Sequence, residues 1–244
     1  MSARRRDPHV GIVVPARDER DLIGRCLDSI IVAAAQVDAR VSIVVVADSC
    51  RDGTAQAARA AAQRARASRN CELVVLEIDA ENVGIARSVG CRQAIAAGCS
   101  WLALTDADSV VPENWVGEHV QMQHAGFDVV IGTVRPDFDD LSAAHVRQWL
   151  ETHEPGRPNG HVHGANLGVR ASAYLTAGGF APLAEHEDNE LVARLVASGA
   201  TVVATDRAEV MTSGRTLGRT AGGYAGHLRG IAESLERDAR SLRG

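Results

Sequence analysis

Residues 101–108 have the sequence WLALTDAD, an apolar run that ends in two aspartates one residue apart. The run has the composition of a buried strand, and carboxylates at the end of such a strand are costly unless a cation meets them. Two aspartates at positions i and i+2 of an extended segment project to the same side, so Asp106 and Asp108 can face one cation. Mg²⁺ and Mn²⁺ prefer a few carboxylates together with water and phosphate oxygens. The stretch therefore predicts a divalent-metal site at the end of a strand.

Asp-x-Asp spacing is a weak signal by itself, because the chain contains it twice. The second pair, Asp137 and Asp139, follows Pro136 and is predicted to open a surface helix. Only Asp106 and Asp108 end a predicted central strand, so position rather than spacing singles them out.

Apolar runs and helical periods alternate through the first half of the chain. Strands are predicted over residues 9–14, 41–47, 73–78, 101–105 and 127–132, and helices over about 18–31, 54–67 and 85–97. Strands that are apolar on both faces and separated by helices imply a parallel sheet covered on both sides. Ligands of such sheets bind outside the carboxyl ends of the strands. The polar segments 15–19, 48–54 and 106–108 all fall at these ends, which favours a binding site there.

The pattern changes after about residue 135. Residues 153–166 are rich in glycine, proline and histidine and are interpreted as an active-site loop. A strand over 167–169, a helix over 189–197, a strand over 201–204 and a polar helical segment from about 217 are predicted to follow. No repeat or linker divides the chain, so we predict one α/β domain over residues 1–244.

The composition excludes several classes of protein. With 244 residues and a net charge of −5, the chain has no electrostatic preference for nucleic acid or an anionic membrane. No window approaches the roughly 18 apolar residues of a membrane span. The five cysteines form no CxxC pair, which argues against a disulfide framework or a zinc knuckle. We therefore expect a cytoplasmic protein without a transmembrane segment, whose basic start is a disordered tail.

Six segments in order resemble a family 2 glycosyltransferase of the nucleotide-diphospho-sugar transferase superfamily. They are VVPARDE (13–19), VVVADSCRDGT (44–54), NVGIARSVG (82–90), TDADSVVPENWV (105–116), HGANLGVR (163–170) and HEDNELVARL (186–195). The resemblance implies a GT-A (Rossmann-like) fold, with a mostly parallel central sheet flanked by helices. It divides the single domain into a nucleotide-sugar-binding half (9–135), an acceptor and catalytic half (136–216) and a C-terminal helical segment (217–244).

The resemblance also implies an activity. It is metal-dependent, inverting transfer of a sugar, of the hexosyltransferase type, from a nucleoside-diphosphate sugar to a hydroxyl of a small-molecule or carrier-linked acceptor. The metal is Mn²⁺ or Mg²⁺, and a homodimer is an open option for the assembly. The family commonly has two adjacent aspartates after the second strand, and Ala47 stands in place of one of them. The donor nucleotide therefore stays open between UDP, which we favour, and GDP.

On the donor side, matching family positions assign roles to ten residues. Pro15, Ala16, Arg17 and Glu19 match the loop against the nucleoside, Asp48 the group at the base or ribose, and Asn82 and Arg87 the next donor segment. Asp106, Ala107 and Asp108 match the motif that holds the diphosphate, with Asp106 at the ribose or metal waters and Asp108 on the metal. The structural alternatives are a turn-forming aspartate for Asp48 and a solvated helix-face arginine for Arg87.

On the acceptor side, Asp188 matches the base that deprotonates the acceptor hydroxyl, with Glu187 supporting the acceptor site. A carboxylate at a helix start is favoured in its charged form, which makes it a weak base, and the alternative is an N-cap with first-turn acids. His163, Gly164 and Asn166 match the pocket for the acceptor or donor sugar, whereas His161 is interpreted as a loop residue. Arg215 is expected to clamp the diphosphate or an acidic acceptor. His227, the only histidine beyond residue 186, is the candidate third metal ligand.

Two other functions stay open at this point. A sugar-phosphate nucleotidyltransferase also combines a nucleotide-binding α/β sheet with a metal-bound aspartate. It would carry a glycine-rich loop with a lysine near the first strand, where this chain has PARDE (15–19). A catalytically silent nucleotide-sugar-binding protein would keep the donor motifs and could lose the base, so the presence of Glu187 and Asp188 argues against it.

Overall fold

The computed structural model describes residues 8–66, 68–154, 157–158, 161–218 and 223–241, and the expected basic tail lies outside them. Its strands are β1 His9–Ala16, β2 Arg40–Asp48, β3 Cys71–Ile78, β4 Trp101–Leu104, β5 Ser109–Val110, β6 Val129–Pro136, β7 Leu167–Arg170 and β8 Val202–Thr212. Its α-helices are α1 Ile23–Ala35, α2 Thr54–Ala65, α3 Val83–Ala96, α4 Trp115–His124, α5 Ala143–Thr152, α6 Ala171–Thr176, α7 Glu187–Ala197 and α8 Tyr224–Ser241. A 3₁₀ turn, η1, spans Phe138–Asp140.

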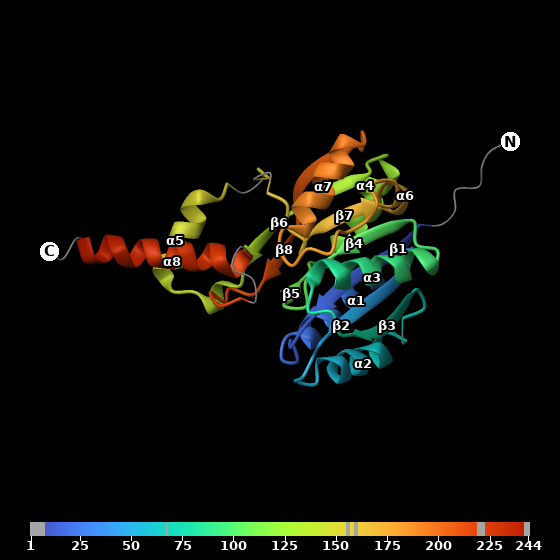
Figure 1. The fold of residues 1–244 in the computed structure, drawn as a ribbon, viewed down its shortest axis with the longest axis horizontal. Helices are drawn as coiled ribbons and strands as arrows, with labels where there is room; N and C mark the ends of the chain where they lie inside the picture. Colours follow the sequence, from blue (N-terminus) through green and yellow to red (C-terminus); the bar gives the residue numbers. More distant parts are fainter. Residues whose placement is uncertain (1–7, 67, 155–156, 159–160, 219–222, 242–244) are drawn as a thin grey trace.

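All eight strands belong to one sheet, in the order β3-β2-β1-β4-β7-β6-β8-β5. β3, β2, β1 and β4 are parallel, as expected for strands joined by helices. β7 runs antiparallel to both β4 and β6, β6 and β8 are parallel, and β5 is antiparallel to β8. The predicted mostly parallel sheet is therefore confirmed, and it continues through both halves of the chain (Figure 1).

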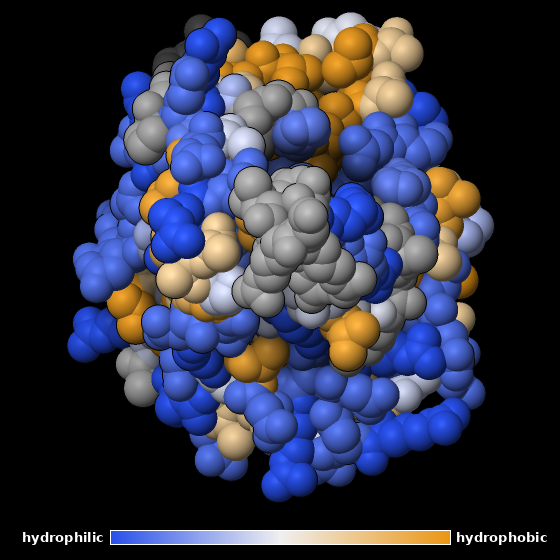
Figure 2. Space-filling model, turned by 90° about the vertical axis from the view of Figure 1, so that its left-hand side faces the viewer, coloured by the Kyte–Doolittle hydropathy of each residue, from blue (hydrophilic) through white to orange (hydrophobic). Residues whose placement is uncertain are grey.

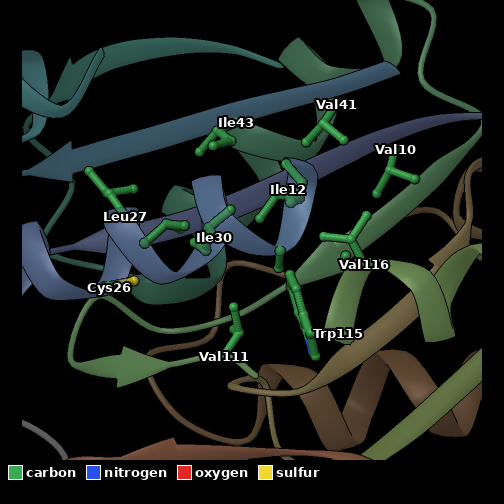
Figure 3. Packing of buried hydrophobic residues seen from close by; sticks show 14 of the residues in the cluster. Val10, Ile12, Cys26, Leu27, Ile30, Val41, Ile43, Val111, Trp115 and Val116 are labelled. Carbon is green, nitrogen blue, oxygen red and sulfur yellow. The ribbon is translucent and has the colours of Figure 1, made fainter. Parts of the chain in front are cut away.

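Two apolar layers cover the sheet, one on each face. Side chains alternate along a strand, so Ile12 of β1 faces one layer and Val13 faces the other. The first layer contains buried residues of α1, α2 and α4, with Trp115 and Val116 packed near Ile12 and Ile30 (Figure 3). The second layer contains buried residues of α3, α6 and α7. Burial of strands on both faces is the physical reason why their sequences are continuous apolar runs.

The observed elements differ from the predicted ones at several ends. The predicted start of the first helix at about residue 18 is wrong, because α1 begins only at Ile23 and the Asp18 carboxylate accepts the backbone N–H of Arg51 at 2.7 Å. Pro15 does not end β1, which continues to Ala16. The segment at Asp137 forms only the 3₁₀ turn η1, and α4 and α5 had no counterpart among the predicted elements.

Helices α5 and α8 lie together beyond the ends of β6 and β8 (Figure 1), and Tyr224 at the start of α8 packs against the first layer. The coloured surface at this end is mostly hydrophilic, with apolar side chains in separate groups (Figure 2). The predicted C-terminal helical segment is represented by α8 among the residues described there. Within the described part of the chain, no helix is both long and apolar enough to cross a membrane.

Candidate active site

The carboxyl ends of β1, β2 and β3 bring the expected nucleoside-side residues to one edge of the sheet. The strands run parallel, and the pairing of Ala16 with Ala47 and of Asp48 with Ile78 shows that their ends are level. Pro15 and Ala16 are the last residues of β1, and Arg17 and Glu19 follow in the loop to α1. The topology therefore places the first three predicted donor segments side by side.

Backbone strain is concentrated in the loops at this edge. Asp18, Ser49 and Glu81, which follow β1, β2 and β3 respectively, have φ values of 47°, 53° and 49°. Non-glycine residues in the left-handed region cost free energy and tend to occur at functional sites. Arg17 bridges two of these loops through an ion pair of 2.8 Å with Glu81. The strained loops thus surround the edge at which the sequence predicted the nucleoside.

Asp48 is buried and holds the loop after β3. Its Oδ1 accepts the backbone N–H groups of Ala80 at 2.7 Å and Glu81 at 2.9 Å, and its Oδ2 accepts that of Asn82 at 2.8 Å. Burial opposes ionisation of Asp48, but these N–H groups outweigh it and lower its pKa. Asp48 therefore positions the loop after β3, and both of its carboxylate oxygens already accept hydrogen bonds from the backbone of that loop.

Asn82 and Gly84 fix the start of α3. The Asn82 side chain accepts the N–H of Ile85 at 3.0 Å, which is a standard N-cap. Gly84 lies against the backbone of residues 181–183, where a Cβ would collide with carbonyl oxygens of Ala181 and Leu183. Another segment of the chain therefore approaches the backbone closely at Gly84.

Asp106 and Asp108 follow β4, and each contacts an arginine. Arg87 lies 2.6 Å from Asp106 Oδ1, and Arg215 lies 2.8 Å from Asp108 Oδ2. Ala107, between them, is buried in the first apolar layer. Burial and the neighbouring charge of Asp106 raise the pKa of Asp108 to about 6, although Arg215 acts in the opposite direction. In this structure the guanidinium groups of Arg87 and Arg215 offset the free-energy cost of placing the two carboxylates at the end of a buried strand.

Arg87 joins the donor-side aspartate to the predicted catalytic pair. Its side chain is 4% exposed, and its Nη1 lies 2.5 Å from Glu187 Oε1 while its Nη2 donates to Asp106. Burial disfavours the guanidinium charge, but Asp106, Glu187 and Asp188 outweigh this and raise the pKa of Arg87. Gly164 packs so closely on Arg87 that a Cβ at Gly164 would overlap the guanidinium. The solvated helix-face alternative for Arg87 is therefore wrong.

Glu187 and Asp188 open helix α7 but have different surroundings. Glu187 is buried, and burial raises its pKa in spite of Arg87. Asp188 is partly exposed, and its Oδ2 accepts the N–H of Gly164 at 2.7 Å while its Oδ1 accepts the N–H of Asn189 at 2.7 Å. Asp188 is thus the more accessible of the two carboxylates, and its partners differ from those of Glu187.

His163, Tyr224 and His227 form a row that leads from this cluster to α8. The ring of His163 lies 5.9 Å from that of Tyr224, which lies 6.1 Å from that of His227. Burial lowers the pKa of His163 to about 4, and Asp188 partly opposes the shift. Asn166, which was predicted to line the same pocket, is buried. It accepts the Trp115 indole N–H at 2.9 Å and donates to two backbone carbonyls.

Arg215 closes the site from the segment after β8. It pairs with Glu19 through both Nη atoms, at 2.7 and 3.1 Å, in addition to Asp108. Burial opposes the charge of Arg215, but Glu19 and Asp108 outweigh it and raise its pKa. Arg215, which was predicted to clamp the diphosphate, therefore joins Glu19 of the predicted nucleoside loop to Asp108 of the predicted metal motif.

The acidic residues fit a small divalent cation. Asp106, Asp108 and Glu19 provide hard oxygen donors around two arginine side chains, and their mutual repulsion favours an added positive charge. No group of three or more His, Cys, Asp or Glu side chains among the described residues is arranged as a ready metal site. His227 in particular is not grouped with Asp106 and Asp108, because it lies in the row with Tyr224. The two aspartates are the residues that would hold the metal.

Several contacts of the site had no signal in the sequence. The ion pair of Glu19 and Arg215 joins residues 196 positions apart, and the pair of Arg87 and Glu187 joins residues 100 apart. Tyr224 was not singled out, because a tyrosine in a glycine-containing segment carries no pattern of its own.

Comparisons with known proteins bear on the family and the fold of this chain. The model of glycosyl transferase family 2 matches residues 11–174. The mannosyltransferase PcManGT from Pyrobaculum calidifontis, solved with GDP-Man and Mn²⁺, is 21% identical with a TM-score of 0.68, covering 98% of this chain and 66% of its own. Residues 1–349 of TarS from S. aureus with UDP-GlcNAc are 16% identical with a TM-score of 0.63, covering 89% of this chain and 61% of that chain.

The chain spans only part of these relatives and 36% of the longer TarS chain, with which it shares 15% identity and a TM-score of 0.61. Comparison with curated proteins finds no match. At these identities the solved structures establish the fold, which is the predicted GT-A fold. Because the family model matches more than half of its residues, the chain belongs to glycosyl transferase family 2.

Proposed function

We propose that this chain is a metal-dependent, inverting glycosyltransferase that uses a nucleoside-diphosphate sugar. One observation carries the proposal: Arg87 binds both Asp106, from the donor motif, and Glu187, next to the candidate base. A group that pairs with both segments keeps the donor phosphates and the acceptor hydroxyl in one small volume. Proximity of that kind is a large part of the catalysis of group transfer.

On the donor side, the nucleoside lies against Pro15, Ala16 and Arg17, at the strained edge that Asp48 shapes. Asp106 and Asp108 hold the divalent metal, which when bound stabilises the negative charge that develops on the leaving nucleoside diphosphate. PcManGT was solved with GDP-Man and Mn²⁺ and TarS with UDP-GlcNAc, so solved proteins of this fold include one with a GDP-sugar and one with a UDP-sugar. For this chain we favour a UDP-sugar, with a GDP-sugar as the alternative.

On the acceptor side, Asp188 removes the proton of the acceptor hydroxyl. The oxygen then forms a bond to the anomeric carbon while the bond from that carbon to the diphosphate breaks, and its electron pair leaves with the nucleoside diphosphate. Attack from the face opposite the leaving group inverts the configuration. Glu187 keeps its place through Arg87, and Gly164 orients Asp188 through its backbone N–H. The hydrogen bonds that Asp188 accepts from Gly164 and Asn189 fix the orientation of its carboxylate, which is the first requirement of a general base.

The acceptor in this proposal is a small molecule or a carrier-linked intermediate that enters beside His163. We further propose that the enzyme works in the cytoplasm. All five cysteines are free in the structure, although four are buried, which suits a reducing compartment.

Calorimetry with UDP and GDP, with and without Mn²⁺, tests the donor site. We expect metal-dependent binding that D108A abolishes, and metal-independent binding that D108A leaves unchanged would contradict the assignment. D188N should bind the donor as the wild type does but lose transfer. Transfer at the wild-type rate would mean that another group is the base, and loss of donor binding in D188N would mean that Asp188 serves the donor instead. A wild type that binds donor and transfers to none of a panel of hydroxyl acceptors would favour the silent binding protein.

A further inference from the structure

Arg215 makes more charged contacts than any other arginine in the candidate site. Its guanidinium reaches Glu19 Oε1 at 2.7 Å, Glu19 Oε2 at 3.1 Å and Asp108 Oδ2 at 2.8 Å. Bidentate contacts of this kind are the strong form of the arginine–carboxylate interaction. Asp108 is therefore bound to a cation already, and that cation belongs to the protein.

The two arginines at the aspartates differ in their freedom to move. The Arg87 side chain is 4% exposed, and Gly164 and Glu187 enclose it. The Arg215 side chain is 35% exposed and belongs to the irregular segment after β8. Removal of the Arg87 guanidinium from Asp106 would thus require unpacking of the interior. Removal of the Arg215 guanidinium from Asp108 requires only a movement of that side chain.

The segment that carries Arg215 is tied down just before this residue. The Thr212 hydroxyl donates to Asp108 Oδ1 at 3.4 Å, and the N–H of Gly214 donates to Asp140 at 2.8 Å. Gly214 also lies against the carbonyl of Asp137, where a Cβ would come within 2.6 Å. These contacts form an anchor from which the Arg215 side chain can move while residues 212–214 stay in place.

We propose that Arg215 is a latch that competes with the divalent metal for Asp108. Before the donor is loaded, Arg215 neutralises Asp108 and Glu19 and prevents their repulsion from opening the site. Metal binding at Asp108 displaces the guanidinium, which is then free for an anionic group such as the donor diphosphate. The inference rests on the proposed donor site, and it adds that metal and Arg215 exclude each other at one carboxylate.

Mn²⁺ binding to the full chain, without nucleotide, tests the competition. The free Mn²⁺ signal in electron paramagnetic resonance would be followed for wild type, R215Q, R215K and the control R64Q. Arg64 pairs with Asp28 at 2.7 Å on the surface, so R64Q removes the same charge away from the site. Because loss of a charged hydrogen bond changes a binding constant by roughly tenfold, R215Q should bind Mn²⁺ about tenfold more tightly than wild type. R64Q should bind as the wild type does.

R215K separates competition for the carboxylate from a general effect of charge. Lysine keeps the charge but loses the bidentate contact, so R215K should bind Mn²⁺ with an affinity between those of wild type and R215Q. An R215K affinity equal to wild type, or an R215Q affinity equal to or weaker than wild type, would overturn the latch. D108A distinguishes the two hypotheses: if it binds Mn²⁺ like wild type, the donor-site assignment has failed, whereas loss in D108A without a gain in R215Q rejects the latch alone.

Hydrogen–deuterium exchange of residues 215–218, which follow the anchor, gives a second measurement that needs no variant. In the wild type, Mn²⁺ alone should raise the exchange of this segment severalfold, because Arg215 no longer holds it to Asp108 and Glu19. Exchange that Mn²⁺ leaves unchanged, at concentrations that saturate the protein, would also overturn the latch.

Discussion

The substitution G164A tests whether Arg87 holds the two halves of the site together. A Cβ at Gly164 would overlap the guanidinium of Arg87, which has only 4% of its side chain exposed and cannot retreat to solvent. Displacement of Arg87 would leave Glu187, itself 6% exposed at its side chain, as a buried carboxylate without its partner. Breaking a buried pair of this kind costs about 3–5 kcal/mol.

A loss of this size is a large part of the roughly 5–15 kcal/mol that stabilises an ordinary domain. We therefore expect urea unfolding to show G164A to be less stable by about 3–5 kcal/mol. Calorimetry should show weaker Mn²⁺-dependent nucleotide binding, since Asp106 loses its partner together with Glu187.

The matched control is G24A, at the second residue of helix α1, where an added Cβ would have no neighbour within 4 Å. Alanine in a helix is favoured over glycine by roughly 0.5–1 kcal/mol, so G24A should be slightly more stable than wild type. The reasoning would be refuted if G164A lost less than about 1 kcal/mol, below the usual cost of overpacking, and bound nucleotide like wild type, because Arg87 would then have kept its partners.

Two further substitutions test buried titratable groups by urea unfolding. D48N should lower the free energy of unfolding by about 1–3 kcal/mol at neutral pH, because one oxygen that accepts backbone N–H groups becomes a donor. The pKa of Asp48 is lowered, so its charge contributes stability above about pH 4 that is lost progressively as the pH falls further, and a gap between D48N and wild type that does not narrow at all on acidification below about pH 4 would contradict this. Burial lowers the pKa of His119 to about 3, so wild type should lose about 1 kcal/mol per pH unit on acidification below about pH 6.5 through this residue. H119L should lose less than wild type between pH 6.5 and 4.5, and equal acid sensitivity would exclude His119 as the cause.

The sheet, and the edge of it that carries the candidate site, could be predicted because a strand that is buried on both faces has a continuous apolar sequence. β1, β2 and β4 are continuous apolar runs, since both of their faces are covered, and the polar residues at their ends follow from the parallel order. The second half was harder to predict. α4 begins with the fully buried Trp115 after Pro112, Glu113 and Asn114, which resemble a loop, and α5 buries only two residues, His145 and Trp149. Their places depend on contacts with distant elements.

The family, the parallel sheet and the choice of acidic residues for the candidate site all follow from the amino-acid sequence, because motif order, apolar runs and strand ends are local properties. Only the tertiary structure decided which cation each carboxylate meets. Arg87 pairs with Asp106 and Glu187, and Arg215 pairs with Asp108 and Glu19, through contacts between residues 19 to 196 positions apart. Electrostatic pairing depends on distance in space and on burial, and neither quantity is written in the neighbouring residues.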